Sequence, residues 1–184
     1  MKGLIRTIGI FTLVVLFGLS SCKHDGTNSG LNEQVKRLSA QGTDEGVVLR
    51  IAEADLIQLE NKPEYNTAEW ILKVDKPGRY DVWLSSITID TLSLHFADNV
   101  IITAGETKLE KKPAGDEIIA EDKTVSQPWY RADSHMGSVF FSQAGEYPIQ
   151  VIGEGVEPHS SDLSKISPEK QTLINSVILR PKLN

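Results

Sequence analysis

The sequence predicts an all-β protein, an antiparallel β-sandwich, and two features carry this prediction. From residue 47 onward, apolar side chains recur at every second position in short segments separated by turn residues, which is the period of a half-buried strand. In addition, a turn glycine is followed two residues later by a tyrosine and an alternating run, at residues 78–80 and again at 145–147. Short, evenly spaced strands with glycine turns are typical of a two-sheet sandwich and leave little room for helix.

The first 21 residues have the pattern of a signal peptide. Lys2 and Arg6 precede an uncharged apolar run over residues 8–19, which is too short for a comfortable membrane span. The run ends in Leu-Ser-Ser-Cys at residues 19–22, which resembles the lipobox of bacterial lipoproteins. The alternative is an ordinary signal peptide followed by an incidental cysteine.

The lipobox resemblance implies where in the cell the protein is located. In bacterial lipoproteins the signal is cut before the cysteine, whose thiol carries a diacylglycerol, so Cys22 is the expected lipidation site and palmitate the expected acyl group. The resemblance implies a partner membrane reached through this anchor, in the bacterial envelope. Lys23 and His24 follow the cysteine and the first acid is Asp25, which fits delivery to the outer membrane, with the leaflet left open. Cys22 is the only cysteine in the chain, so an intramolecular disulfide is impossible.

Size and charge restrict the mature protein further. Removing 21 residues from 184 leaves 163, enough for one domain. The net charge of −6 argues against a nucleic-acid partner and against attraction to anionic headgroups. Residues 22–46 are expected to be the lipidated cysteine and a flexible linker; Leu31, Val35 and Leu38 have helical spacing, which fits a short helix or an extension of the tether. The folded domain is expected over residues 47–184.

The strands follow in order along this domain. Residues 68–75 place Trp70 on the same face as Leu72 and Val74, so we expect Trp70 in the core. Residues 76–79 carry proline and glycine at the second and third positions of a type II turn, which predicts a hairpin, and residues 137–153 repeat the hairpin. The expected strand regions are 47–57, 68–75, 79–89, 91–98, 99–105, 137–141, 147–153 and 173–182.

These segments resemble, in order, galactose-binding-like β-sandwiches, a group that includes many carbohydrate-binding modules. The resemblance rests on IAEAD (51–55), WILKVDKPGRYDVWL (70–84), GSVFFSQAGEYPIQV (137–151) and INSVILRPK (174–182), and it covers residues 47–182. It implies a jelly-roll sandwich that binds carbohydrate without catalysis, in the loops at one end of the sandwich or on a concave sheet face.

Aromatic side chains with polar neighbours are the candidate ligand contacts, because a pyranose stacks its apolar face on a ring and hydrogen-bonds its hydroxyls to planar polar groups. Alternation points Trp83 away from the core-facing side, toward a ligand or toward a crossing loop. Trp129, Tyr130, Arg131 and Asp133, with His135 nearby, lie in a polar stretch predicted as a loop. The competing interpretation is that Trp129 closes the end of the core and Arg131 pairs with Asp133.

A metal site and a catalytic centre have less support in the sequence than a carbohydrate site has. The family resemblance implies a structural calcium held by a glutamate on the first strand, for which Glu53 is the candidate, but calcium needs six to eight oxygens and Asn175-Ser176 stands where a carboxylate partner would be welcome. A glutamate at a sheet edge is the alternative. The chain contains neither HExxH nor GxSxG, and its acids cluster at residues 114–123 in what reads as a solvated loop, so we expect no enzyme.

The sequence therefore predicts an envelope lipoprotein that binds a glycan. The alternative is a structural or interaction module that docks on an envelope protein and has no sugar site.

Overall fold

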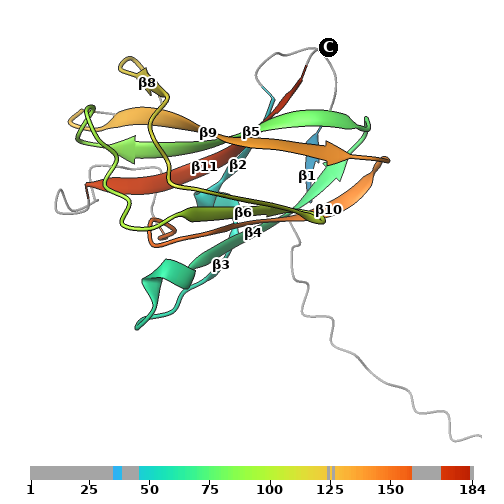
Figure 1. Cartoon of the computed structure of the whole chain (residues 1–184), viewed down its shortest axis with the longest axis horizontal. Helices are drawn as coiled ribbons and strands as arrows, with labels where there is room; N and C mark the ends of the chain where they lie inside the picture. Colours follow the sequence, from blue (N-terminus) through green and yellow to red (C-terminus); the bar gives the residue numbers. More distant parts are fainter. Residues whose placement is uncertain (1–34, 39–45, 124, 126, 159–170, 183–184) are drawn as a thin grey trace, which may run out of the picture. The chain divides into compact units, whose positions relative to one another are not determined.

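The computed structural model describes residues 35–38, 46–123, 125, 127–158 and 171–182, and these form a β-sandwich (Figure 1). Among these residues, no helix has the length and apolar character needed to cross a membrane. The predicted signal peptide, Cys22 and most of the predicted linker lie outside the described residues.

One layer is a five-stranded antiparallel sheet, drawn in the upper part of Figure 1. Its spatial order is β2-β11-β5-β9-β8. The longest strands, β5 and β9, pair along their whole length at the centre of the sheet. The strands are β2 (Val47–Arg50), β5 (Gly78–Thr88), β8 (Glu117–Ile119), β9 (Tyr130–Phe141) and β11 (Thr172–Pro181).

The other layer is a six-stranded sheet with the order β1-β4-β10-β6-β7, in which β3 also pairs with β4. Every pairing in it is antiparallel except β1 with β4, which is parallel. The predicted all-β sandwich is therefore confirmed. The elements are β1 (Val35–Leu38), β3 (Asp55–Ile57), β4 (Thr67–Val74), β6 (Val100–Ala104), β7 (Thr107–Lys111) and β10 (Gly145–Ile152), with one-turn 3₁₀ helices η1 (Ile51–Glu53) and η2 (Pro63–Tyr65).

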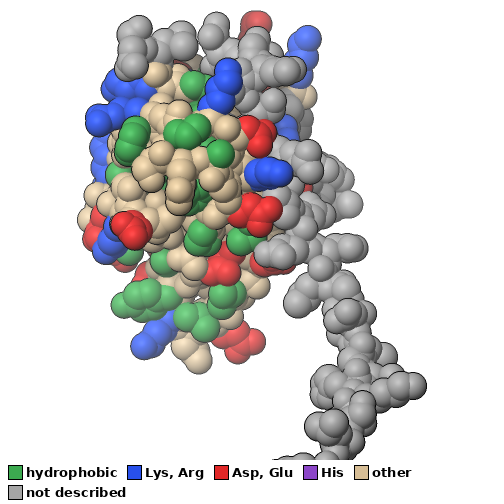
Figure 2. Space-filling view, turned by 90° about the vertical axis from the view of Figure 1, so that its right-hand side faces the viewer, with side chains coloured by type: hydrophobic (Ala, Val, Ile, Leu, Met, Phe, Trp, Pro, Cys, Tyr) green, Lys and Arg blue, Asp and Glu red, His purple; other side chains and the backbone are tan. Residues whose placement is uncertain are grey.

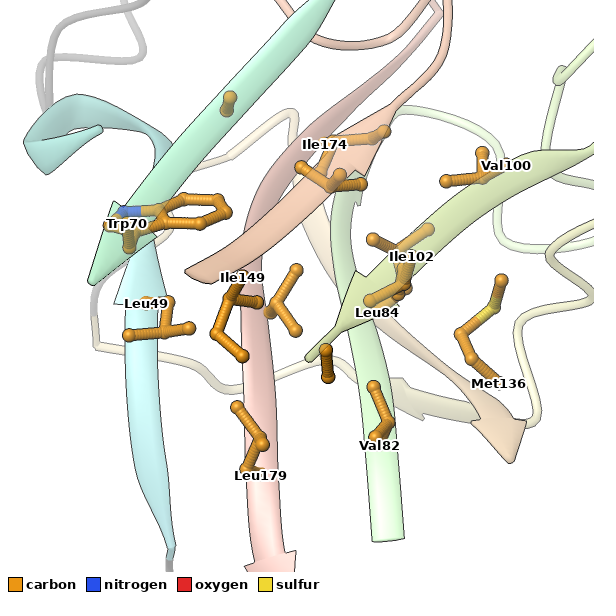
Figure 3. Packing of buried hydrophobic residues seen from close by; sticks show 14 of the residues in the cluster. Leu49, Trp70, Val82, Leu84, Val100, Ile102, Met136, Ile149, Ile174 and Leu179 are labelled. Atoms are coloured by element: carbon orange, nitrogen blue, oxygen red, sulfur yellow. The ribbon is translucent and has the colours of Figure 1, made fainter. Parts of the chain in front are cut away.

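The core fills the space between the two sheets (Figure 3). Successive side chains of a strand point to opposite faces, so each strand contributes alternate positions; β4 alternates between half-buried and buried along its whole length. Trp70 is buried here, as predicted, and its indole N–H donates to the carbonyl oxygen of Arg50 at 3.1 Å. Leu49, Ile149 and Leu179 approach the same region from three other strands (Figure 3).

The two predicted hairpins are wrong. β4 and β5 lie in different sheets, and so do β9 and β10, so each glycine turn carries the chain from one sheet to the other. The strands pair across instead: β4 with β10 in one sheet and β5 with β9 in the other, with Val74 opposite Gly145 and Gly78 opposite Phe141. A ribbon of two antiparallel strands thus continues through both layers, which is the winding of a jelly roll.

A tyrosine fixes each of these two crossings. The Tyr80 hydroxyl donates to the carbonyl oxygen of Lys76 at 2.8 Å, and the Tyr147 hydroxyl donates to that of Gln143 at 2.8 Å, in both cases four residues back along the chain. Phe141 lies between the two rings, with centroid distances of 5.6 Å to Tyr80 and 4.6 Å to Tyr147. The repeated sequence pattern is therefore a pair of corners that share one aromatic cluster.

Four local expectations also differ from the structure. Residues 35–38 form the strand β1, where a helix or tether was expected, and residues 91–98 form no strand. Gly78 has a φ of 157°, whereas a type II turn needs about +80° at its glycine. Arg131, Asp133 and His135 belong to β9 and not to a loop.

Candidate functional site

Trp83 lies on the outer face of the five-stranded sheet, as alternation predicted, and is half-buried there. His135 on β9 is its cross-strand partner, with ring centroids 5.1 Å apart. From β11, the guanidinium carbon of Arg180 lies 4.9 Å from the centroid of the indole ring. The indole is therefore flanked by side chains from both neighbouring strands, which limits the ring area that a ligand could cover.

Arg131 and Asp133 point to the same outer face and form an ion pair. Asp133 is fully buried and accepts hydrogen bonds from Arg131 at 2.8 and 2.6 Å. Arg131 also donates to Asp122 at 2.9 Å, and Arg180 lies 3.5 Å from Asp133. The hydrogen bonds that Arg131 donates to Asp133 and, second, to Asp122 raise the pKa of Arg131 well above its usual value. These charged side chains are thus paired with one another, in agreement with the interpretation in which Arg131 pairs with Asp133.

Trp129 is buried, with 4% of its surface exposed. It packs with Ile87 and Leu173 in a small cluster separate from the main core, which Val125 also contacts. The structure therefore places the Trp129 ring inside this separate cluster, where it has little surface to offer to a ligand. Tyr130 follows as the first residue of β9 and is half-buried.

Glu53 lies in the one-turn helix η1 and not on a strand. Asn175 is the unpaired residue where the register of β11 against β5 shifts between Ile174 and Ser176. Across the described parts of the chain, three or more histidine, cysteine, aspartate or glutamate side chains never come together in a group that could hold a metal ion. The calcium thus stays an expectation from the family resemblance alone.

The sandwich has a cavity of about 320 Å³ at one end. Strands β5 and β10 end here and β4, β6 and β11 begin here, whereas the two tyrosine corners lie at the opposite end. Chain segments that are far apart in the sequence therefore meet around it. Its described lining residues are Pro63, His95, Phe96, Glu154, Gly155, Glu157, Gln171, Thr172 and Leu173.

Hydrogen bonds fix the polar side of this cavity. The His95 ring nitrogen Nε2 lies 3.0 Å from the Asp90 carboxylate, and the backbone N–H of His95 donates to the Thr172 hydroxyl at 3.3 Å. Glu154 accepts a hydrogen bond from the backbone N–H of Ala97 at 2.6 Å. The pKa of Asp90 is lowered, first by the backbone N–H of Leu92 and then by His95. The imidazole and the Glu154 carboxylate are therefore held at the cavity rather than left free to rotate.

The chemistry of this lining suits a small ligand with many hydroxyl groups. Pro63 supplies exposed apolar surface, whereas Phe96 and Leu173, each 3% exposed, lie in the wall and present only a small edge to the cavity. Carboxylates, an amide, a hydroxyl and an imidazole then offer acceptors and donors for hydroxyls. A concave site of a few hundred Å³ that combines apolar walls with a few placed polar groups is the usual form of a small-molecule site.

Sequence reasoning missed this cavity. Residues 91–98, which carry His95 and Phe96, were taken for a strand because of their alternating apolar positions. Glu157 and Gln171 line the cavity from either side of residues 159–170, which lie outside the described residues. The available signal was the run Gly-Glu-Gly at 153–155 directly after an alternating strand.

Comparison with solved structures finds this fold within larger chains. The α-L-fucosidase of Vibrio sp. strain EJY3 matches with a TM-score of 0.60 and 22% identity, over 82% of this chain and 24% of that chain. The GH26-CBM35 β-(1,4)-mannanase of Podospora anserina matches with a TM-score of 0.45 and 13% identity, over 77% of this chain and 29% of that chain. The chain thus spans less than a third of these enzymes, and the fucosidase likeness shows a shared β-sandwich fold. Neither a family model nor a curated protein sequence matches the chain.

Proposed function

We propose that this protein is a lipid-anchored envelope protein whose β-sandwich binds carbohydrate without catalysis in the cavity at its loop end. The observation that carries the proposal is the cavity itself, in which Phe96 and Leu173 lie beside the polar side chains of His95, Glu154 and Gln171. Its volume of about 320 Å³ is at the small end of the range of ligand sites, which suits a ligand group of the size of one sugar unit.

Carbohydrate is the favoured ligand because the cavity offers partners for both the C–H groups and the hydroxyl groups of a sugar. Pro63 can contact the C–H face of a sugar ring, with the small exposed edges of Phe96 and Leu173 behind it, and the carboxylate and amide oxygens can accept from its hydroxyls. The shared fold with part of a fucosidase is an analogy at the level of fold and adds only modest support, since function belongs to sites and not to folds.

The proposal assigns no catalysis, and two features of the described carboxyl groups are in keeping with this. A glycosidase needs a general acid whose pKa is raised. The described carboxyl groups with an altered pKa are Asp81, Asp90 and Glu110, and all three are lowered. In the cavity, Glu154 already accepts a hydrogen bond from the main chain, which suits a fixed acceptor better than a proton donor.

The anchor is proposed from the sequence at residues 1–22, where the lipobox resemblance places the acyl groups on Cys22. Each buried methylene contributes about 0.8 kcal/mol, so two or more chains would hold the protein at the membrane durably. Metabolic labelling with palmitate should mark the wild-type protein and not Cys22→Ser. A labelled Cys22→Ser variant, or an unlabelled wild type, would show that the anchor is misassigned.

Affinity electrophoresis of the full chain in mild detergent tests the sugar site. Gels that contain a plant, algal or bacterial polysaccharide should retard the wild-type protein in at least one case, and His95→Ala and Gln171→Ala should abolish this retardation. Gln143→Ala is the matched control for Gln171→Ala, because it removes the same side chain at the corner end of the sandwich. Free migration through every polysaccharide, together with a protein recovered by crosslinking in the envelope, would favour the interaction module instead.

A further inference from the structure

An exposed aromatic ring lies on the one-turn helix that contributes Pro63 to the cavity. Tyr65 ends the one-turn helix η2 and exposes 54% of its surface, whereas Pro63, at the start of the same turn, lines the cavity. Two residues of a 3₁₀ helix advance only about 4 Å along its axis, so the backbone of Tyr65 lies close to the cavity wall, while its side chain points in a different direction from that of Pro63. The ammonium group of Lys62 lies 5.9 Å from the centroid of the Tyr65 ring.

The segment that carries Tyr65 is attached to the wall of the cavity. The side-chain amide of Asn66, a buried residue, accepts from the Leu59 N–H at 2.9 Å and donates to the Val156 carbonyl at 3.2 Å. The Asn66 carbonyl accepts from the Gly153 N–H at 3.0 Å, and Gln58 donates to the Val156 carbonyl at 2.9 Å. Four hydrogen bonds thus order residues 58–66, three of them directly to the chain segment that contributes Glu154 and Gly155 to the cavity.

An exposed ring on an ordered backbone segment is well suited to binding. Ordering a side chain or loop on binding costs free energy, and a position that is already fixed avoids most of that cost. Ile57, at the end of β3, and Leu59, in the segment between β3 and β4, are also exposed. Figure 2 shows hydrophobic side chains gathered at the lower edge of the molecule, where Figure 1 places the segment from β3 to η2.

We infer that Tyr65 forms a second subsite next to the cavity, so that the ligand is an oligosaccharide whose chain continues from the cavity over η2. This inference rests on the proposed carbohydrate function and adds the class of ligand. One sugar unit occupies the cavity, and the next unit stacks on Tyr65, with the Lys62 ammonium available to donate to its hydroxyls or ring oxygen. A monosaccharide fills only the cavity and gains nothing from Tyr65.

The dependence of affinity on ligand length tests this inference. Isothermal titration of the full chain would use cellohexaose, mannohexaose and xylohexaose, each with its monosaccharide. Wild-type protein should bind one hexaose more tightly than the monosaccharide. Tyr65→Ala should weaken that hexaose by roughly three- to tenfold, the range of one aromatic stacking contact, and leave the monosaccharide unchanged.

Two controls make the result specific. Tyr65→Phe keeps the ring and should keep the hexaose affinity, and Phe140→Ala removes another exposed ring, 61% exposed and on the outer face of the other sheet, without effect. If Tyr65→Ala leaves hexaose binding intact, the Tyr65 subsite is overturned, whereas the proposal that the cavity binds carbohydrate is not. Absence of binding by the wild type to all six sugars would overturn the subsite together with the proposed function. Unchanged monosaccharide binding by Tyr65→Ala would show that the variant is folded.

Discussion

The two tyrosine corners allow a quantitative test of how the fold is held. Tyr80→Phe and Tyr147→Phe each delete one hydroxyl that donates to a carbonyl oxygen four residues back, at 2.8 Å in both cases. The surroundings differ. Tyr80 is almost fully buried and its burial raises the pKa of its phenol, whereas the hydrogen bond of Tyr147 lies at the exposed turn.

This difference sets the expected magnitudes. A hydrogen bond contributes about 0.5–1.5 kcal/mol net, and the cost of losing one rises when water cannot reach the abandoned acceptor. Tyr80→Phe should therefore lower the free energy of unfolding by about 1 kcal/mol. Tyr147→Phe should lower it by about 0.3 kcal/mol, because water can replace the hydroxyl at the Gln143 carbonyl.

Urea unfolding of the full chain, followed by tryptophan fluorescence, measures both values, and the double variant completes the cycle. The two hydroxyls bond to different carbonyl oxygens while both rings contact Phe141, so a departure from additivity of more than about 0.5 kcal/mol measures coupling through Phe141. A larger loss for Tyr147→Phe than for Tyr80→Phe would refute the reasoning, since it would mean that burial does not decide the cost. Equal losses near zero would show that the hydroxyls do not secure the corners.

Three further predictions concern stability and charge. Phe141→Ala should cost about 3–5 kcal/mol in the same urea assay, because it empties the space between both corner rings; a loss below 1 kcal/mol would contradict the shared cluster. Gly46→Ala should also destabilise, since Gly46 has a φ of +72° and an added Cβ would clash with the Leu179 carbonyl; an unchanged midpoint would exclude this backbone approach. Ser138→Ala should raise the pKa of Asp81 toward 3.8, because the Ser138 hydroxyl is the largest cause of its lowering; NMR titration of the carboxyl measures this, and an unmoved pKa would contradict it.

The sign of the Asp81 effect also determines how stability depends on pH. A carboxyl group whose pKa is lowered by folding stabilises the native state above its unfolded pKa and loses that contribution as the pH falls through the folded value. Ser138→Ala should therefore reduce the stability difference between neutral pH and pH values below 3.8, and leave the stability at the acidic end unchanged by this linkage.

Strand periodicity was enough to predict the layers of the sandwich. The alternation around Trp70 placed it correctly in the core, and the alternation around Trp83 placed it correctly on the outer face. The pairing of strands was not predictable in the same way. A glycine turn between two alternating runs has the same local pattern whether the second strand turns back beside the first or crosses to the opposite sheet, so the corners were taken for hairpins.

The candidate site was even less predictable from local sequence pattern than the strand pairing. Trp129 is buried because it meets Ile87 and Leu173, which come from strands elsewhere in the chain, and its neighbours in the sequence carry no sign of this. The cavity is assembled from Pro63, His95 and the segments around residues 154 and 171, so its existence depends on tertiary structure. Reasoning from sequence identified aromatic rings near polar groups and could not tell which of them would be covered.

Hydrogen–deuterium exchange of the full chain, with and without a glycan that retards it in electrophoresis, tests the central claim most directly. The account predicts that the glycan slows exchange in peptides that contain His95 and Phe96, Glu154 to Glu157, and Gln171 to Leu173. Peptides across the corner at residues 141–145 should exchange as before. Protection confined to the outer face around Trp83 and His135, with the cavity peptides unchanged, would contradict it.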